Sequence, residues 1–350
     1  YDHPMVRRRP LRRPACNPAR RAPLRRRTLA AVLVAASAAG LSACSHEAVT
    51  PDSARVLYAT LGSTDANPSD RVAVVDSRSG QKARPFTVGT LPSGLVLEHG
   101  SAHLLVAVKA ENALVEVDTA TGKVTRRVTV GLEPDAVALT PDGNTALVAD
   151  FGDATLTVVR LADFGVASRV PVGRQPVAVA VTPDGRLALV ACYQDGTLNP
   201  VALTSLVPGP PVPVGPEPLA VHVTGDGRTA LVAGFQTSTV VPVSLPGLTA
   251  GGPVPVGVNP TGIGGLPGAP TVWVSGGSSI VPLTVATGQV GAPFAVGGPA
   301  QCIAVTYGAA WVCRGDGTLV QIDTVTGRVI RRVAAGGIPS AIVLSPPFPA

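Results

Sequence analysis

A repeat of about 42 residues is the feature that most limits how this sequence can fold. A Val-Gly pair, usually followed closely by Pro, marks six copies, and a degenerate Ala335-Gly336 pair marks a seventh. The spacings between successive marks are 42, 42, 42, 42, 40 and 39 residues. The Val positions of the six regular pairs are Val88, Val130, Val172, Val214, Val256 and Val296. Such a period is typical of propellers, solenoids and other repeat folds.

Each repeat contains four short runs that have the pattern of β-strands. In the second copy an alternating run at 136–139 leads into a Pro-Asp-Gly turn, an apolar run at 146–149 and a third run at 155–159. The same turn returns one and two periods later as Pro183-Asp184-Gly185 and Gly225-Asp226-Gly227. Period-2 alternation between Asp-Gly turns predicts antiparallel hairpins. Four strands in each period predict the blade of a β-propeller.

The two ends of the repeat region are complementary fragments of one blade. Residues 55–87 supply three strands without a first strand, and residues 338–345 supply a first strand alone. We therefore expect an all-β fold, a seven-bladed β-propeller of four-stranded antiparallel blades over residues 55–350, closed by its C-terminal strand. Such closure removes exposed strand edges.

The second strands carry a tetrad that resembles the YVTN-type β-propeller repeat of bacteria. It reads Leu-Val-Ala-Asp at 147–150, Leu-Val-Ala-Cys at 189–192 and Leu-Val-Ala-Gly at 231–234. The resemblance covers residues 55–345 and implies the propeller fold. Every copy lacks the Asn that is typical of the fourth position in that family. The resemblance implies no specific activity, because such propellers are scaffolds for many functions.

The N-terminal segment has the organisation of an export signal. Ten Arg residues precede Thr28, and an apolar run at 28–43 follows them. A basic segment, a short apolar run and small residues describe a signal peptide. Leu41-Ser42-Ala43-Cys44 resembles the lipobox of bacterial lipoproteins, which implies lipidation of Cys44. We expect a signal peptide at 1–43, a lipid-anchored tether at 44–54 and a location on the extracytoplasmic side of the cell membrane. The alternative is an ordinary signal peptide with an incidental Cys.

Removal of the export signal reverses the sign of the net charge. The whole chain carries +6, but residues 44–350 contain 18 basic and 21 acidic residues. A mildly acidic propeller lacks the basic surface that nucleic-acid binding requires. The expected partners are therefore the membrane, through the lipid anchor, and an unknown envelope protein, peptide or glycan, with no nucleic acid.

One face of the predicted propeller collects varied polar residues. The loops between fourth and first strands and those between second and third strands lie on this face, which is where propellers usually bind. The alternative for any single residue is a solvated loop without a role. The candidates are Glu133, Asp135, Asp150, Arg174, Gln175, Tyr193, Glu217, Asn259, Gln301 and Arg314.

Catalytic and metal-binding patterns are weak in this sequence. Phe151, Tyr193 and Phe235 occupy equivalent places in successive blades, where they either stack on a ligand or pack between blades. No His or Cys cluster has zinc spacing, and no glycine-rich loop has the spacing of a phosphate loop. We therefore predict no catalytic residue, metal or cofactor. A binding scaffold is favoured over the alternative, a propeller enzyme of the lactonase, lyase or quinoprotein kind.

Register arithmetic predicts a disulfide in the sixth copy. This copy is two residues shorter in its first turn, so Tyr307-Gly308 becomes a two-residue hairpin loop. Cys302 then faces Cys313 across the first two strands, as Ala136 faces Ala149 in the second copy. An exported protein permits the bridge. The alternative is two small buried apolar side chains. Cys192 is expected to stay free.

Overall fold

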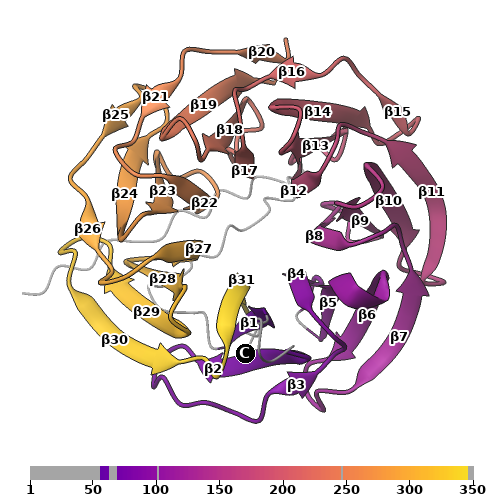
Figure 1. Cartoon of the computed structure of the whole chain (residues 1–350), viewed down its shortest axis with the longest axis horizontal. Helices are drawn as coiled ribbons and strands as arrows, with labels where there is room; N and C mark the ends of the chain where they lie inside the picture. Colours follow the sequence, from indigo (N-terminus) through magenta and orange to yellow (C-terminus); the bar gives the residue numbers. More distant parts are fainter. Residues whose placement is uncertain (1–55, 63–68, 101, 246, 346–350) are drawn as a thin grey trace, which may run out of the picture. The chain divides into compact units, whose positions relative to one another are not determined.

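The computed structural model describes residues 56–62, 69–100, 102–245 and 247–345. The predicted signal peptide, the tether and Cys44 lie outside these residues. Seven antiparallel blades form a ring, which confirms the predicted all-β propeller (Figure 1). Within the described ranges, no helix is long and apolar enough to span a membrane.

Four blades have four strands each. Blade 1 consists of β4 (Pro92–Leu97), β5 (His103–Val108), β6 (Ala113–Asp118) and β7 (Val124–Thr129), with a 3-10 turn η1 (Lys109–Glu111) between β5 and β6. Blade 2 consists of β8 (Pro134–Leu139), β9 (Thr145–Asp150), β10 (Thr155–Arg160) and β11 (Gly165–Pro171). Blade 6 consists of β27 (Ala300–Thr306), β28 (Ala309–Arg314), β29 (Thr318–Asp323) and β30 (Val329–Ala334). Blade 7 consists of β31 (Ile338–Leu344), β1 (Val56–Gly62), β2 (Arg71–Asp76) and β3 (Phe86–Thr87).

The outermost strand of blades 3 to 5 is broken into two short pieces. Gly and Pro cause the breaks, because Pro cannot donate to a strand ladder and Gly weakens it; the run Pro208 to Pro211 interrupts blade 3. Blade 3 contains β12 (Pro176–Val181), β13 (Leu187–Cys192), β14 (Thr197–Ala202), β15 (Val207–Pro208) and β16 (Val212–Pro213). Blade 4 contains β17 (Pro218–Val223), β18 (Thr229–Gly234), β19 (Thr239–Ser244), β20 (Thr249–Ala250) and β21 (Val254–Pro255). Blade 5 contains β22 (Pro260–Gly265), β23 (Thr271–Gly276), β24 (Ser279–Thr284), β25 (Gln289–Val290) and β26 (Phe294–Ala295).

The C-terminal strand closes the ring as the sequence predicts. β31 pairs with β1 from Leu57 opposite Leu344 to Gly62 opposite Ile338. Seven apolar clusters occupy the seven interfaces between neighbouring blades, and blade 7 contributes to the clusters on both of its sides. Trp311 in one of these clusters is fully buried. Because each blade buries its faces only against its neighbours, the core is continuous around the ring.

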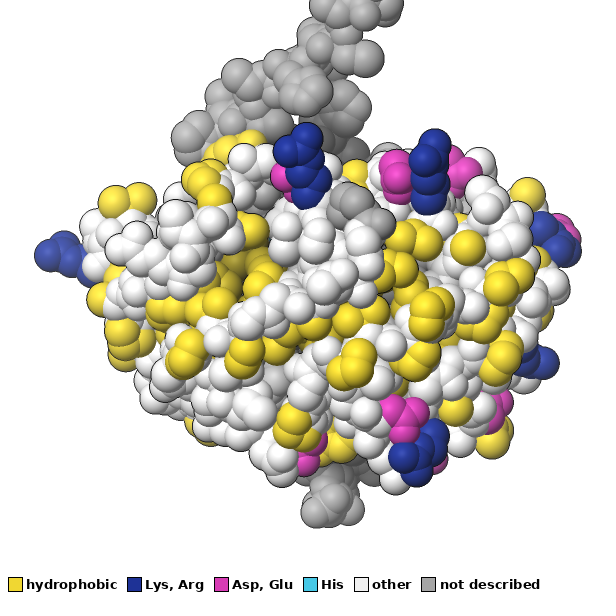
Figure 2. Space-filling view, turned by 90° about the horizontal axis from the view of Figure 1, so that it is seen from above, with side chains coloured by type: hydrophobic (Ala, Val, Ile, Leu, Met, Phe, Trp, Pro, Cys, Tyr) yellow, Lys and Arg dark blue, Asp and Glu magenta, His cyan; other side chains and the backbone are white. Residues whose placement is uncertain are grey.

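Figure 2 shows the molecule from the side, with Lys, Arg, Asp and Glu at the upper and lower edges and also at the left and right sides. Uncharged and hydrophobic side chains cover most of the band between these edges in this view.

Candidate functional site

The face that carries the turns between first and second strands is built from a repeated structural motif. The Thr140, Thr182 and Thr224 hydroxyls donate to the Asp carboxylates two residues later, over 2.5, 2.5 and 2.6 Å. Each carboxylate also accepts the backbone N–H of the residue after the Gly. These hydrogen bonds, from the Thr hydroxyl above all, lower the pKa of Asp142, Asp184 and Asp226. Identical local bonding in three blades indicates a structural role for this face.

On the other face, a β-bulge opens the first strand of every blade. In β8, Pro134 lies opposite Asp150 and Ala136 lies opposite Ala149, so Asp135 between them has no opposite residue on β9. Five other first strands skip one residue at the same place, and β4 skips two. A bulge re-aims its unpaired side chain. We call the seven bulged residues at this point the mouth ring: Ser93, Asp135, Val177, Leu219, Thr261, Gln301 and Ser340.

The mouth ring surrounds one end of the central channel. All seven of its residues line a cavity of about 560 Å³, together with the two following residues of most first strands. The next residues along the strands are small, as Gly94, Ala136 and Gly262 show, and the third are aliphatic, as Leu95, Val137 and Ile263 show. The channel is therefore apolar below its mouth and chemically varied at the mouth.

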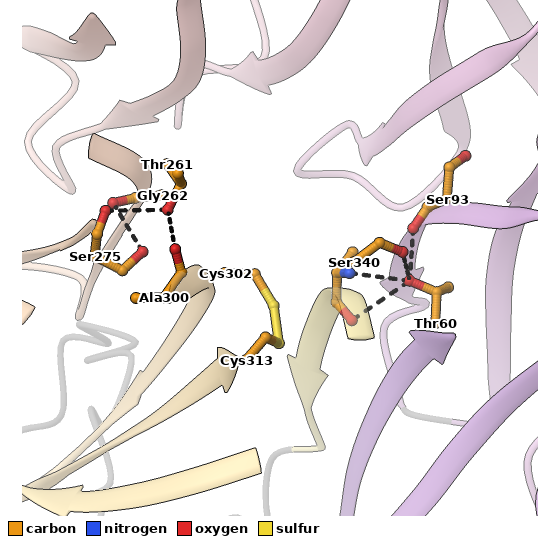
Figure 3. Close-up of a disulfide and its surroundings, with 10 residues drawn as sticks. Thr60, Ser93, Thr261, Gly262, Ser275, Ala300, Cys302, Cys313 and Ser340 are labelled. Atoms are coloured by element: carbon orange, nitrogen blue, oxygen red, sulfur yellow. Dashed lines mark hydrogen bonds between the residues drawn. A yellow bond between two sulfur atoms is a disulfide. The ribbon is translucent and has the colours of Figure 1, made fainter. Parts of the chain in front are cut away.

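Hydroxyl groups of the mouth ring join neighbouring blades. The Ser93 hydroxyl donates to the Pro134 carbonyl of blade 2 over 2.7 Å, and the Thr261 hydroxyl donates to the Ala300 carbonyl of blade 6 over 3.0 Å. The Ser340 and Thr60 hydroxyls lie 2.9 Å apart, and Thr60 donates to the Ser93 carbonyl of blade 1 over 2.6 Å (Figure 3). These bonds fix the positions of the first strands around the channel.

The loops around the mouth hold a second ring of backbone contacts. Glu133, Gln175 and Glu217 have φ of 50°, 54° and 54°, a left-handed conformation that costs a non-Gly residue about 1 kcal/mol. Their carbonyls accept the backbone N–H groups of Phe151, Tyr193 and Phe235, over 3.1, 2.9 and 3.0 Å. This motif fixes the backbone, while the side chain at each position differs between blades.

Ion pairs and hydrogen bonds connect several predicted rim residues to their neighbours. Lys109 Nζ lies 2.9 Å from Asp135 Oδ1 and 4.6 Å from the centre of the Phe151 ring. Asp195 accepts the backbone N–H and the guanidinium of exposed Arg174, each over 2.7 Å, and these bonds lower the pKa of Asp195.

Other predicted rim residues make individual contacts. Partial burial and a hydrogen bond to the Glu217 carboxylate raise the pKa of Tyr193. The Asn259 amide donates to the Phe235 carbonyl over 3.1 Å. Glu133 is exposed, and its backbone N–H donates to Asn112 Oδ1 over 2.9 Å. These side chains lie in loops of several blades around the mouth.

Two of the predicted rim residues are largely withdrawn from solvent. Asp150 is completely buried at the end of β9, where Oδ2 accepts the Thr157 and Thr155 hydroxyls over 2.6 and 3.0 Å. A Cβ on Gly131 would lie 2.5 Å from Asp150 Cγ, which explains the Gly of the Val-Gly pair in this blade. Arg314 keeps only 12% of its side chain exposed and pairs with Asp316. Burial leaves Asp150 unavailable to a surface ligand.

Sequence reasoning missed a group of potential metal ligands on the structural face. Within the described ranges, ligand atoms of Glu98, His103 and Glu116 lie within 4.8 Å of one another. His103 Nδ1 lies 3.3 Å from Glu98, but the Arg126 guanidinium and the Thr125 hydroxyl already bind Glu116. Hydrogen bonds from Arg126 and Thr125 outweigh burial and lower the pKa of Glu116. The Arg126 cation therefore already neutralises the most buried member of this group.

Cys302 and Cys313 lie opposite each other on neighbouring strands, as the predicted strand register requires. Thr306 pairs with Ala309 and Cys302 with Cys313, whose sulfur atoms are joined as a disulfide beside the channel (Figure 3). Cys192 is a buried free thiol, and burial raises its pKa to about 12. A thiol that stays protonated at neutral pH is a poor nucleophile.

We expect the Cys302–Cys313 bridge to be present in the protein taken from its native compartment. The bridge closes a short loop, because the cysteines are 11 residues apart. Replacing both residues with Ala should therefore lower the free energy of unfolding by about 2–3 kcal/mol on the chain-entropy model. Mass spectrometry of a non-reduced digest checks the pairing directly. Two free thiols in native protein would contradict it.

Comparison with known proteins supports the fold. No protein-family model matches the chain, and neither does any curated protein sequence. A functionally unknown protein from Desulfotomaculum acetoxidans DSM 771 is 17% identical, with a TM-score of 0.74 over 84% of this chain and 99% of that one. Kuenenia stuttgartiensis hydrazine synthase is 16% identical, with a TM-score of 0.64 over 73% of this chain and 93% of that one. Dihydro-heme d1 dehydrogenase NirN is 14% identical, with a TM-score of 0.62 over 84% of this chain and 76% of that one. At these identities the similarity establishes the seven-bladed β-propeller architecture and nothing about activity.

Proposed function

We propose that this chain is an exported lipoprotein of the YVTN-repeat type, whose propeller binds an envelope partner through the face around the mouth ring. The contrast between the two faces is the observation that carries the proposal. One face repeats the same Thr-Asp turn in three blades. The other places seven bulged residues of six different types around one cavity. Repetition serves the fold, whereas variation at equivalent positions is what recognition of an asymmetric partner requires.

The enzyme alternative lacks a comparable observation. Enzymes on this fold would need reactive groups that converge at the channel. Among the described residues that line the cavity, Asp135 is the only carboxylate, and no imidazole lines it. His222 lies on a first strand next to lining residues, and burial lowers its pKa. Two of the similar structures are named as enzymes, but the shared fold does not transfer their chemistry to this chain.

Reversing the charges of the varied face should abolish partner binding. The variant combines Glu133→Lys, Arg174→Glu and Glu217→Lys, three loop residues around the mouth ring. Like charges at an interface cost several kcal/mol, so the amount of complex trapped by a chemical crosslinker on intact cells should fall at least about tenfold. The control, Asn144→Lys, Arg186→Glu and Arg228→Glu, also changes the charge at three residues, which are exposed on the structural face. Equal loss in both variants, at unchanged melting temperatures, would place the site elsewhere.

Fractionation of cells that produce a Cys44 variant tests the proposed lipid anchor. Cys44→Ser removes the thiol that lipidation requires, and several acyl chains are needed for stable attachment. The substituted protein should therefore move from the membrane fraction to the soluble fraction. A protein that stays in the membrane fraction in unchanged amount would contradict lipidation at Cys44.

A further inference from the structure

The mouth ring divides into a polar arc and an apolar arc. In ring order, blades 5, 6, 7, 1 and 2 supply polar residues, and blades 3 and 4 supply Val177 and Leu219. The five polar residues are Thr261, Gln301, Ser340, Ser93 and Asp135. An apolar sector of two neighbouring blades therefore faces a polar sector across the channel. A ligand that fills this mouth must itself have one apolar edge and one polar edge.

The polar arc has more acceptors than donors to offer. The Ser93 and Thr261 hydroxyl groups donate their protons to carbonyls of neighbouring blades. Only the lone pairs of these hydroxyl oxygens therefore remain to accept a hydrogen bond from a ligand. Asp135 gives one carboxylate oxygen to Lys109, and its carboxylate only accepts. The Gln301 amide has no hydrogen-bond partner within the described part of the chain, so it can both donate and accept. The complementary ligand edge must carry several donors with nearby acceptors, as a set of hydroxyl groups does.

Charge within the mouth ring itself is balanced. Lys109 neutralises Asp135, the only charged member of the mouth ring, over 2.9 Å. Arg314, the last residue of β28 and the neighbour of Cys313 in sequence, is paired with Asp316. A net charge on the ligand would lose its hydration here without gaining an unpaired partner of opposite sign. The mouth therefore favours a neutral ligand.

We infer that the channel mouth binds a neutral sugar unit of an envelope glycan, with its C–H face on Val177 and Leu219 and its hydroxyl groups towards the polar arc. This inference rests on the proposed binding function and names its ligand class. A sugar ring combines an apolar C–H face with an edge of O–H donors. The cavity of about 560 Å³ lies within the usual size range of small-ligand sites. A peptide offers fewer donors for an arc that is rich in acceptors.

Binding of defined neutral disaccharides tests this ligand class. The full mature protein, purified in detergent, is titrated by isothermal calorimetry with N,N′-diacetylchitobiose, cellobiose and maltose, and with a neutral capped tetrapeptide. At least one disaccharide should bind, and more tightly than the peptide. Gln301→Leu removes the unpartnered amide, and Leu219→Asn puts a polar group into the apolar arc. Each should weaken binding of that disaccharide about fivefold, which corresponds to the roughly 1 kcal/mol that a lost hydrogen bond or apolar contact contributes.

The control Asn144→Ala lies on the structural face and should leave the affinity unchanged. If neither Gln301→Leu nor Leu219→Asn changes the affinity for the disaccharide, and both variants keep the wild-type melting temperature, the inference is wrong. The absence of binding by all three disaccharides, or tighter binding of the tetrapeptide, would also overturn it. If these outcomes occur while charge reversal around the mouth still removes the crosslinked complex, the sugar assignment fails and the binding face remains. If charge reversal also has no effect, both proposals fail.

Discussion

Deletion of residues 336–350 is expected to lower the melting temperature by at least about 10 °C, the largest effect of any change considered. The deletion removes β31, which covers the inner edge of β1 along its length. It also takes Ala341, Ile342, Val343 and Leu344 from the apolar clusters on both sides of blade 7. Partly burying such side chains contributes about 1–2 kcal/mol each, and 1 kcal/mol corresponds to about 2–4 °C in a domain of this size class.

A peptide complementation experiment provides the control for this deletion. A synthetic peptide of residues 337–345, added in excess, should restore much of the lost stability because it can pair with the exposed edge of β1. A scrambled peptide of the same composition should not. Melting curves followed by circular dichroism measure both. An unchanged curve for the truncated protein would show that β31 does not close the ring.

The second large effect concerns Asp150, whose carboxyl group is completely buried. Burial raises its pKa from 3.8 to about 6, although the Thr157 and Thr155 hydroxyls partly offset that effect. Oδ1 has no hydrogen-bond partner within the described ranges. The folded protein thus holds this proton more tightly than the unfolded chain does. The contribution of Asp150 to stability is present below about pH 4 and is lost as the pH rises through about 6.

Asp150→Asn should therefore stabilise the protein above pH 6 by up to about 3 kcal/mol, the free energy that corresponds to this change in pKa. Near pH 4 the variant and the wild type should be similar in stability. Chemical denaturation at several pH values measures the difference. Asp142→Asn serves as a control in which the change in stability should have the opposite sign. Hydrogen bonds lower the pKa of Asp142, so loss of this carboxylate should destabilise the protein at neutral pH. Parallel stability curves for Asp150→Asn and the wild type would contradict the explanation.

The repeat predicts the architecture because period, alternation and turn chemistry all agree. Four strands in each period, Asp-Gly turns and the split blade lead to seven blades and to the pairing of β31 with β1. The opposed positions of Cys302 and Cys313 also follow from register. The broken outer strands of blades 3 to 5 do not follow, because short segments next to Gly and Pro depend on how much pairing survives locally.

The candidate site was only partly predictable. Asp135 and Gln301 were expected at the rim, but the mouth ring depends on bulges, which appear in the sequence only as a residue between Pro or Ala and a small side chain. Asp150 looked like a loop residue because the strand pattern ends there. Its signal was its place as the fourth residue of the tetrad. Glu98, His103 and Glu116 come together from three segments of blade 1, and no local pattern in the sequence shows that proximity.

Site-specific photocrosslinking in living cells tests the central claim, that the face around the mouth ring is the occupied one. A photoreactive benzoylphenylalanine replaces exposed Gln194 or Gln236 on that face, and exposed Asn144 or Arg186 on the structural face. We predict that irradiation gives higher-mass adducts from Gln194 and Gln236 and few from the other two positions, because only a side chain at the interface lies within reach of the partner. Equal adduct yields from the two faces, or adducts from Asn144 and Arg186 alone, would contradict it.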